Sequence, residues 1–262
     1  MDENVFGGQG ENRLYGDLAW LFPIISPLEQ YLDETELFCR KIAGQLRIPG
    51  TTLLHLGCGA GLNDFVFKRH FQVTGLDASE AVLERARRLN PEARYVKGDF
   101  RSARLGEIFS VVAAVDCLDY MLTEADLRAA FATAWEHLAP GGVFFFLLAM
   151  TREAFDQNHT TSWTNSTGGT DVAFVENCYD PDPGDTRYEL TMLYLIRQQG
   201  KLRVEHDRHA FGLFAGARVR ELLAEVGFEV RFEDYHPTPE ALGHAGQGSN
   251  ATFPMFFGLK SL

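Results

Sequence analysis

The sequence predicts an α/β protein with a Rossmann-like, doubly wound and mostly parallel sheet of seven strands, with an antiparallel β insertion after the fifth strand. Three observations predict this fold. Short apolar segments alternate with helical segments up to residue 150, which is typical of a parallel sheet covered on both faces. Residues 151–210 break this alternation, and it resumes after them. The 262 residues, 45% of them hydrophobic, suffice for a single domain over residues 1–262.

The first half of the pattern begins with a helix predicted over residues 28–46, where apolar residues recur at helical spacing before Pro49 and Gly50. Strands are then predicted at residues 51–56, 72–76, 93–97 and 109–115, and helices at residues 61–70 and 80–89. The last of these strands is almost wholly apolar, as expected for a strand buried on both faces. Ser79 is a suitable N-cap for the helix that follows it, which has acids early and arginines late.

The second half contains a helix predicted at residues 124–138, ended by Pro140, and a fifth strand at residues 143–150. Two extended stretches around Gln199-Gly200-Lys201 predict a β-hairpin within the insertion. The regular pattern then continues to the C-terminus. It predicts a helix at residues 217–226 with a stop at Gly227, a strand at 228–234, and a last strand at 252–260 in which Pro254 favours an edge or a strand beginning.

Composition and charge limit the possible partners. The net charge of −12 disfavours nucleic acid and anionic membrane surfaces, and no apolar run is long enough to span a membrane. The four cysteines are widely spaced without a C-x-x-C pair, which favours reduced thiols and a cytoplasmic protein. No metal is expected, because no group of His, Cys and Asp has ligand spacing. Residues 1–11 are acidic and Gly-rich, unlike a signal peptide.

Three glycines, Gly57, Gly59 and Gly61, end the first strand in the segment LLHLGCGAG. A loop of this kind between a buried strand and a helix lets the backbone approach a ligand. The dinucleotide fingerprint would need a glycine at Leu62, so the loop disfavours an NAD-dependent dehydrogenase. A simple tight turn is the alternative interpretation of the glycines.

Two aspartates follow the next two strands. Asp77 ends the second strand, where a carboxylate can accept hydrogen bonds from both hydroxyls of a ribose. Asp99 ends the third strand, where it can hold the amino edge of an adenine between the apolar walls Ala78 and Phe100. A single aspartate in such a place can be a helix cap or turn former. The glycine loop and two aspartates at three successive strand ends favour a ligand site.

The chain resembles the class I S-adenosylmethionine-dependent methyltransferases in the segments LLHLGCGAG, VTGLDASEAVLERARRL, YVKGDF and WEHLAPGGVFFF. The resemblance runs from about residue 53 to 150 and resumes at residue 218. It implies S-adenosyl-L-methionine as cofactor, and it assigns the glycine loop to the methionine part, Asp77 to the ribose and Asp99 with Phe100 to the adenine. The residues that it implies for the methionyl end of the cofactor are Cys58 in the loop and Val115, Asp116 and Cys117 after the fourth strand.

One residue departs from the family pattern. The family often has an acid two residues before the first glycine, where this chain has His55. That acid usually helps to hold the cofactor's amino group or the loop. His55 therefore has two interpretations, as a cofactor-binding residue that uses a ring nitrogen or as a hydrogen-bonded structural histidine.

The ends of the pattern loosely resemble the amino-sugar N-methyltransferases, in which an N-terminal segment closes over the cofactor and inserted strands cover the acceptor. This similarity implies an N-terminal lid and helix within residues 1–48 and an acceptor cover within residues 151–210. The expected reaction is methyl transfer to an N- or O-nucleophile of a small molecule, with a homodimer possible. A catalytically silent scaffold that only binds S-adenosylmethionine is an alternative.

An amine or hydroxyl acceptor can need a base, and histidines of the insertion and a tyrosine of the N-terminal segment are candidates. The candidates are His209, with His206 near it, and Tyr15, whose hydroxyl would approach the transferring methyl group if residues 13–27 form the lid. A structural role for His209, and packing of the lid segment on the far side of the sheet, are the alternatives. The aromatic residues that could line an acceptor pocket, or belong to the core, are Tyr120, Trp163, Phe211 and Phe214. His137 is expected at the surface.

Overall fold

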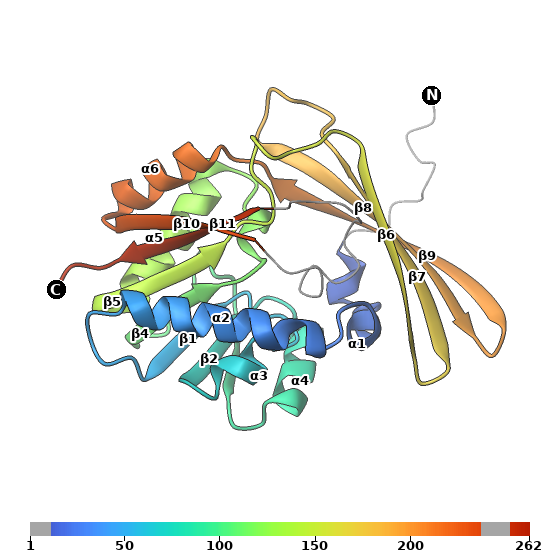
Figure 1. Cartoon of the computed structure of the whole chain (residues 1–262), viewed down its shortest axis with the longest axis horizontal. Helices are drawn as coiled ribbons and strands as arrows, with labels where there is room; N and C mark the ends of the chain where they lie inside the picture. Colours follow the sequence, from blue (N-terminus) through green and yellow to red (C-terminus); the bar gives the residue numbers. More distant parts are fainter. Residues whose placement is uncertain (1–11, 237–251) are drawn as a thin grey trace.

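A computed structural model describes residues 12–236 and 252–262 and contains two sheets (Figure 1). The larger sheet has seven strands in the order β10-β11-β5-β4-β1-β2-β3. Its strands are β1 Thr52–Leu56, β2 Gln72–Asp77, β3 Arg94–Lys97, β4 Phe109–Ala114, β5 Leu138–Leu147, β10 Glu229–Tyr235 and β11 Phe253–Leu259. Strands β1 to β5 pair in parallel, whereas β11 is antiparallel to both β5 and β10. The predicted doubly wound sheet is confirmed.

Helices cover both faces of this sheet. On one face lie α2 Glu29–Gln45 and α3 Asp64–Phe67, and on the other α5 Glu124–His137 and α6 Gly216–Val226. Helix α4 Glu80–Leu89 packs over β2 and β3, and Ser79 caps it by accepting a hydrogen bond from the amide of Val82. None of the helices in these described ranges is both long and apolar enough to cross a membrane.

Strand β4 shows why the sheet needs two helical layers. All six of its residues are buried. Its side chains alternate between the faces, because successive residues of a strand point in opposite directions. Val112 and Ala114 pack with the core beside α5 and α6, and Val111 and Ala113 with the core beside α2 and α3. This position at the centre of the sheet explains the apolar sequence that predicted it.

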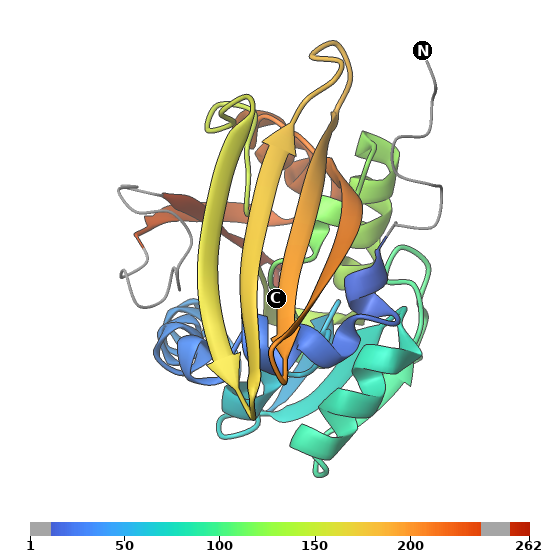
Figure 2. The same cartoon turned by 90° about the vertical axis from the view of Figure 1, so that its right-hand side faces the viewer.

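The insertion forms a separate four-stranded antiparallel sheet (Figure 2). Its strands, in spatial as in chain order, are β6 His159–Thr167, β7 Thr170–Tyr179, β8 Arg187–Gln198 and β9 Lys201–Gly212. The predicted turn at Gln199 and Gly200 joins β8 to β9, with φ of 50° and 77°. A second hairpin at Gly168 and Gly169, with φ of 57° and 78°, was not predicted. Positive φ at both central residues matches the twist of a tight hairpin.

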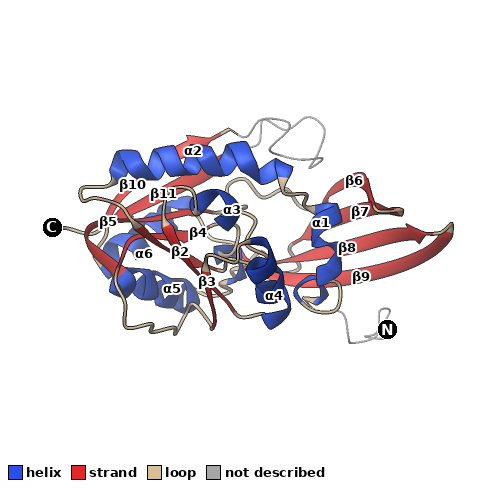
Figure 3. Cartoon of the chain, turned by 90° about the horizontal axis from the view of Figure 1, so that it is seen from below, coloured by secondary structure: helices blue, strands red, loops and turns tan. Residues whose placement is uncertain are grey.

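The N-terminal segment packs against this second sheet (Figure 3). It contains the short helices η1 Arg13–Tyr15, η2 Ala19–Leu21 and α1 Phe22–Ile25 and no long helix, as its prolines predicted. Its apolar side chains Leu14, Leu21 and Ile24 are buried against the inner face of β7 and β8, where they join one core with Phe174 and Tyr194. The acidic, Gly-rich residues 1–11 and the Gly- and His-containing residues 237–251 lie outside the described residues.

Three predictions of local structure need correction. The helix expected over residues 61–70 is regular only at α3, Asp64–Phe67, and turns flank it. Strand β5 begins at Leu138 rather than at residue 143, because residues 138–142 extend along β4 with a shift in register. His137 is buried rather than at the surface. Its Nδ1 donates to the carbonyl of Thr133 at 2.8 Å, and its Nε2 accepts from the amide of Leu105 at 2.9 Å, so the end of α5 is tied to the loop before β4.

Candidate active site

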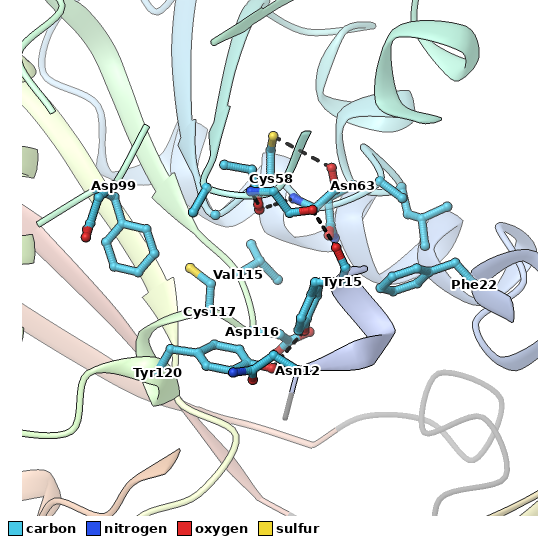
Figure 4. A pocket seen from close by; sticks show the side chains of 18 of the residues that line it. Asn12, Tyr15, Phe22, Cys58, Asn63, Asp99, Val115, Asp116, Cys117 and Tyr120 are labelled. Atoms are coloured by element: carbon cyan, nitrogen blue, oxygen red, sulfur yellow. Dashed lines mark hydrogen bonds between the residues drawn. The ribbon is translucent and has the colours of Figure 1, made fainter. Parts of the chain in front are cut away.

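A pocket of about 480 Å³ lies at the carboxyl ends of β1 to β4, beside the N-terminal segment (Figure 4). This is the edge at which open α/β sheets bind ligands. The predicted site residues that line it are Tyr15, Gly57, Cys58, Gly59, Asp77, Ala78, Asp99, Phe100, Val115 and Asp116. His55, Gly61 and His209 do not line it. The structure thus brings together residues from four strand ends and from the N-terminal segment.

The three glycines of the loop share a backbone conformation that favours glycine, and their surroundings differ. All have positive φ, at 65°, 54° and 76° for Gly57, Gly59 and Gly61. A Cβ on Gly57 would lie 2.5 Å from the Cβ of Cys117, and one on Gly61 would lie 2.7 Å from Nδ2 of Asn90. A Cβ on Gly59 would meet no atom within 4 Å. Gly57 and Gly61 therefore allow close packing, and Gly59 leaves open space at the pocket wall.

The carboxylate of Asp77 is fixed by backbone amides. One oxygen accepts from the amide of Gly59 at 2.9 Å and the other from the amide of Ser79 at 2.8 Å. Burial raises the pKa of Asp77, although both amide bonds oppose the shift. Each oxygen keeps further lone-pair capacity. This orientation could accept the two hydroxyls of a ribose, as the sequence predicts.

Asp99 has a partner that was not foreseen. Its carboxylate accepts from the backbone amide of Arg101 at 2.8 Å and from two guanidinium nitrogens of the same residue at 2.6 and 3.0 Å. Arg101 lowers the pKa of Asp99 and also binds Asp126 at 3.1 Å. An adenine amino group would therefore share this carboxylate with Arg101. Phe100, beside it, lines the pocket.

His55 lies behind the glycine loop, buried at 1% exposure. Its Nδ1 is 2.7 Å from Oδ1 of Asp64, and its Nε2 has no hydrogen-bond partner within the described residues. Asp64 is wholly buried and also accepts from the hydroxyl of Tyr95 at 3.0 Å. The carboxylate absent from position 55 is thus supplied from position 64. Contact between His55 and the cofactor stays a prediction.

The end of the pocket beyond β4 is acidic. Asp116 has φ of 51°, a left-handed conformation uncommon for an aspartate and often found at functional sites. Its side chain is accessible from the pocket, but dense protein around it raises its pKa. Burial and the charge of Asp116 raise the pKa of Glu34, on α2, to about 8. A cation would be stabilised at this end.

The two residues proposed as bases are connected by a third. Tyr15 lines the pocket, and its hydroxyl is 3.0 Å from that of Tyr120, which comes from the short helix η3 Leu118–Tyr120 (Figure 4). Nδ1 of His209 lies 2.5 Å from the hydroxyl of Tyr120 on its other side. His209 is buried and does not line the pocket, because Tyr120 lies between its ring and the pocket. His206, the other candidate, is not among the lining residues.

The predicted aromatic lining divides into two groups. Tyr120 lines the pocket, and Phe211 packs on it with ring centroids 4.7 Å apart. Trp163 instead packs on Phe174 within the second sheet, and Phe214 belongs to the core beside α5 and α6. The lining residues that the sequence did not reveal are Asn12, Phe22, Tyr31, Ala60, Leu62, Asn63, Ser79, Arg101 and Met121. Four of these residues, Ala60, Leu62, Ser79 and Arg101, lie in or beside the predicted strand-end motifs, and this position could have indicated them.

Comparison with known proteins agrees with this geometry. A family model described as "Methyltransferase domain" matches residues 53–142, which contain the glycine loop and both aspartates. A dTDP-3-amino-3,4,6-trideoxy-alpha-D-glucopyranose N,N-dimethyltransferase from Streptomyces venezuelae is 31% identical over 195 residues, covering 73% of this chain and 81% of that protein. The similarity therefore extends well beyond the cofactor motifs.

Solved structures share the whole architecture. The crystal structure of DesVI from Streptomyces venezuelae has a TM-score of 0.79 at 25% identity and covers 94% of this chain and 98% of its own. CalS10, described as an amino pentose methyltransferase from Micromonospora echinaspora with S-adenosylmethionine bound, has a TM-score of 0.74 at 23% identity, with 88% and 92% covered. The second likeness is one of fold.

Proposed function

This chain belongs to the class I S-adenosylmethionine-dependent methyltransferases, and we propose that its acceptor is the amino nitrogen of a nucleotide-linked amino sugar. The family establishes an enzyme that uses S-adenosylmethionine to methylate a small-molecule acceptor. Membership of this family argues against an NAD-dependent dehydrogenase and against a catalytically silent scaffold. The acceptor, the roles of individual residues and the assembly are the matter of the proposal.

The residues that line the pocket suit the chemical groups of the cofactor. When bound, S-adenosylmethionine supplies an electrophilic methyl group on a positively charged sulfur. In our proposal the open backbone at Gly59 and the loop at Cys58 hold the methionine part, Asp77 the ribose, and Asp99 with Phe100 the adenine. The open space at Gly59 and the fixed carboxylate of Asp77 support this assignment. Val115 and Asp116 would then lie toward the reacting end.

The acidic end of the pocket is the observation that favours an amine. Asp116 and the hydroxyls of Tyr15 and Tyr120 line this end. Of the described residues that line the pocket, Arg101 alone is cationic, and Asp99 and Asp126 already bind it. Amines are cations at neutral pH, so this lining attracts an amine and disfavours a carboxylate or phosphate at the reacting position.

The chain's main catalytic task is positioning. A direct displacement needs the nucleophile in line with the methyl group and the departing sulfur, without competing water. We assign the exclusion of water to residues 13–27 and to the insertion, residues 151–210, which together would cover the acceptor. Tyr15 would contact the acceptor nitrogen, and His209 would act on it indirectly, through the hydroxyl of Tyr120. The packing of the N-terminal segment on β7 and β8 supports a shared cover.

The proposal extends to assembly and surroundings. We place the enzyme in the cytoplasm, with neither nucleic acid nor membrane as partner, which the charge of −12 and four free cysteines support. A homodimer could use the outer face of the second sheet, where Leu193, Leu202 and Val204 are 37%, 47% and 58% exposed. Light scattering of the purified protein tests this assembly by its mass.

The acceptor is tested by methyl transfer to matched sugars. We expect methylation of dTDP-3-amino-3,4,6-trideoxyglucose, the sugar named for the Streptomyces venezuelae relative. The same nucleotide sugar with a hydroxyl in place of the amine is the control and should remain unmodified. Methylation of the hydroxyl sugar alone, or of neither sugar nor any other nucleotide-linked amino sugar, would refute the proposed acceptor. Calorimetry should show binding of S-adenosylmethionine and none of NAD.

A further inference from the structure

A line of hydrogen bonds leads from the pocket into the second sheet. The hydroxyl of Tyr15 is 3.0 Å from that of Tyr120, which is 2.5 Å from Nδ1 of His209. The other ring nitrogen of His209, Nε2, lies 2.9 Å from Oδ2 of Asp207. The four side chains come from η1, η3 and β9, far apart in the sequence. Hydrogen bonds therefore connect a pocket-lining hydroxyl to a buried carboxylate.

The end of this line fixes its direction. Asp207 is fully buried, and its oxygens also accept the amides of Leu14 at 2.6 Å and Arg208 at 2.8 Å. Burial alone would raise the pKa of Asp207, but its bonds to His209 and to backbone amides outweigh burial and lower the pKa, so the group is a carboxylate and can only accept. A neutral His209 beside this carboxylate has its proton on Nε2 and presents a lone pair on Nδ1. The relay uses this state, in which Tyr120 donates to that lone pair.

The direction continues to the pocket. The structure has the hydroxyl of Tyr120 donating to that of Tyr15 at 3.0 Å, so the relay requires both hydroxyls to turn until Tyr120 donates to His209 and Tyr15 donates to Tyr120. The oxygen of Tyr15 is then left with lone pairs as acceptors for a group in the pocket. Burial raises the pKa values of both tyrosines, so neither ionises alone near neutrality. A proton given to Tyr15 must therefore be passed on.

Other titratable and charged groups surround this line. They are Arg13 from η1, Tyr31 from α2, Asp77 from the end of β2, Cys117 and Asp119 beside Tyr120, and Tyr188 and Tyr194 from β8. Arg13 is bound by Asp17 at 2.7 Å and Glu205 at 2.9 Å. The His209 ring is buried among aromatic rings, with that of Tyr15 at 5.5 Å. Within the described residues, Asp207 is the carboxylate in contact with it.

We propose that Tyr15, Tyr120, His209 and Asp207 form a proton relay that removes a proton from the acceptor's ammonium group before methylation. This inference rests on the proposed amine acceptor. Tyr15 is the residue that touches the acceptor. His209 and Asp207 are positioning residues that act through the two tyrosines.

The proton balance of the relay is simple. The N–H bond of the ammonium breaks, its electron pair stays on nitrogen, and its proton passes to the oxygen of Tyr15. The hydroxyl proton of Tyr15 passes to Tyr120, and that of Tyr120 passes to Nδ1 of His209. The products are a neutral amine, two neutral tyrosines and an imidazolium beside the carboxylate of Asp207. The proton returns to water by the reverse path when the pocket is open.

Docking of the N-terminal segment completes the relay. The amide of Leu14 binds Asp207, and the amide of Asn12 donates to the carbonyl of Arg208 at 3.1 Å. Tyr15 follows Leu14 directly, so the contacts that fix the end of the relay also place its first hydroxyl. Residues 12–15 must lie on β9 for proton transfer. The relay thus couples closure of this segment to activation of the acceptor.

The pH profile of His209→Asn tests the relay. Asparagine can offer an acceptor to Tyr120 but cannot hold a proton. At pH 7 we expect kcat/KM for the amino sugar to fall about 100-fold, in the range of general acid–base catalysis. As pH rises toward the value at which the free amine is neutral, kcat/KM should rise almost tenfold per pH unit and approach the wild-type value. Tyr120→Phe should behave in the same way.

Matched measurements separate the relay from structural roles. His159→Asn alters an exposed histidine of the same sheet and should retain the wild-type profile. Calorimetry should show that His209→Asn still binds S-adenosylhomocysteine within threefold of wild type. In the wild-type protein without cofactor, nitrogen NMR should find the His209 proton on Nε2 at pH 8.

Two results would overturn the relay. One is an equal loss of activity in His209→Asn at every pH from 6.5 to 9.5. The other is a His209 proton on Nδ1 in the free protein. If the wild-type enzyme methylates no amino sugar at all, the proposed function fails, and the NMR measurement still decides the direction of the hydrogen bonds.

Discussion

The assignment of Asp77 to the cofactor's ribose makes a quantitative prediction for Asp77→Ala. Each carboxylate oxygen accepts one backbone amide, from Gly59 or Ser79, and each has capacity for one ribose hydroxyl. Hydrogen bonds to charged groups contribute about 1.5–3 kcal/mol each. Loss of two such bonds should therefore weaken binding by at least about 3 kcal/mol, or about 150-fold in Kd.

A second ligand distinguishes the ribose contact from damage to the loop. Asp77→Ala also leaves the amides of Gly59 and Ser79 without their partner, which would weaken any ligand. We therefore compare S-adenosylhomocysteine with its 2′,3′-dideoxy analogue in wild type and variant by calorimetry. The wild type should lose about 3 kcal/mol on removal of the hydroxyls, and the variant less than about 1 kcal/mol. An equal loss in both proteins would refute the assignment, even if Asp77→Ala binds weakly.

Three further predictions concern the lid, the glycine loop and a buried acid. Amide exchange of residues 13–27 should slow when S-adenosylhomocysteine binds, and protection confined to the strand ends would contradict the lid. Gly57→Ala should cost more unfolding free energy in urea than Gly59→Ala, because both have positive φ but only Gly57 places a Cβ against Cys117, at 2.5 Å. Burial and the charge of a neighbouring acid raise the pKa of Asp119 to about 7 from an ordinary 3.8. This group therefore stabilises the fold below pH 4, and the contribution is lost as the pH rises to 7. The loss in unfolding free energy is at most about 4 kcal/mol. Asp119→Asn should therefore be more stable than wild type at pH 8 by urea unfolding, with a smaller difference at pH 5.5, and an equal difference at both values would contradict this explanation.

The parallel sheet could be predicted because its strands have one sequence pattern and one environment. Strand β4 is buried at every residue, so the apolar run was sufficient to identify it. The site followed from the same regularity, since the glycine loop and Asp77 and Asp99 occupy successive strand ends. Sheet topology brings such positions to one edge without knowledge of any side-chain contact.

The second sheet was harder to locate because half of its surface faces solvent. Strand β6 alternates exposed Thr and Ser with half-buried residues such as Trp163 and Asn165, and its composition is that of a loop. The N-terminal contributions to the pocket were hidden for another reason. Phe22 and Tyr31 reach it from segments that pack over the strand ends, so no strand-end rule applies to them. Arg101 changed the environment of Asp99 from only two residues away.

The histidine at position 55 shows how a departure from a family pattern can be compensated in space. His55 contacts Asp64, which accepts from Tyr95, whose hydroxyl oxygen in turn accepts from Asn90 at 2.9 Å. Asn90 also donates to the carbonyl of Gly61 at 2.8 Å, so this network holds the back of the glycine loop. A missing acid in the motif therefore does not mean a missing carboxylate. Asp64 supplies a carboxyl group from nine residues later, and the loop is positioned from behind while its front is left free for the cofactor.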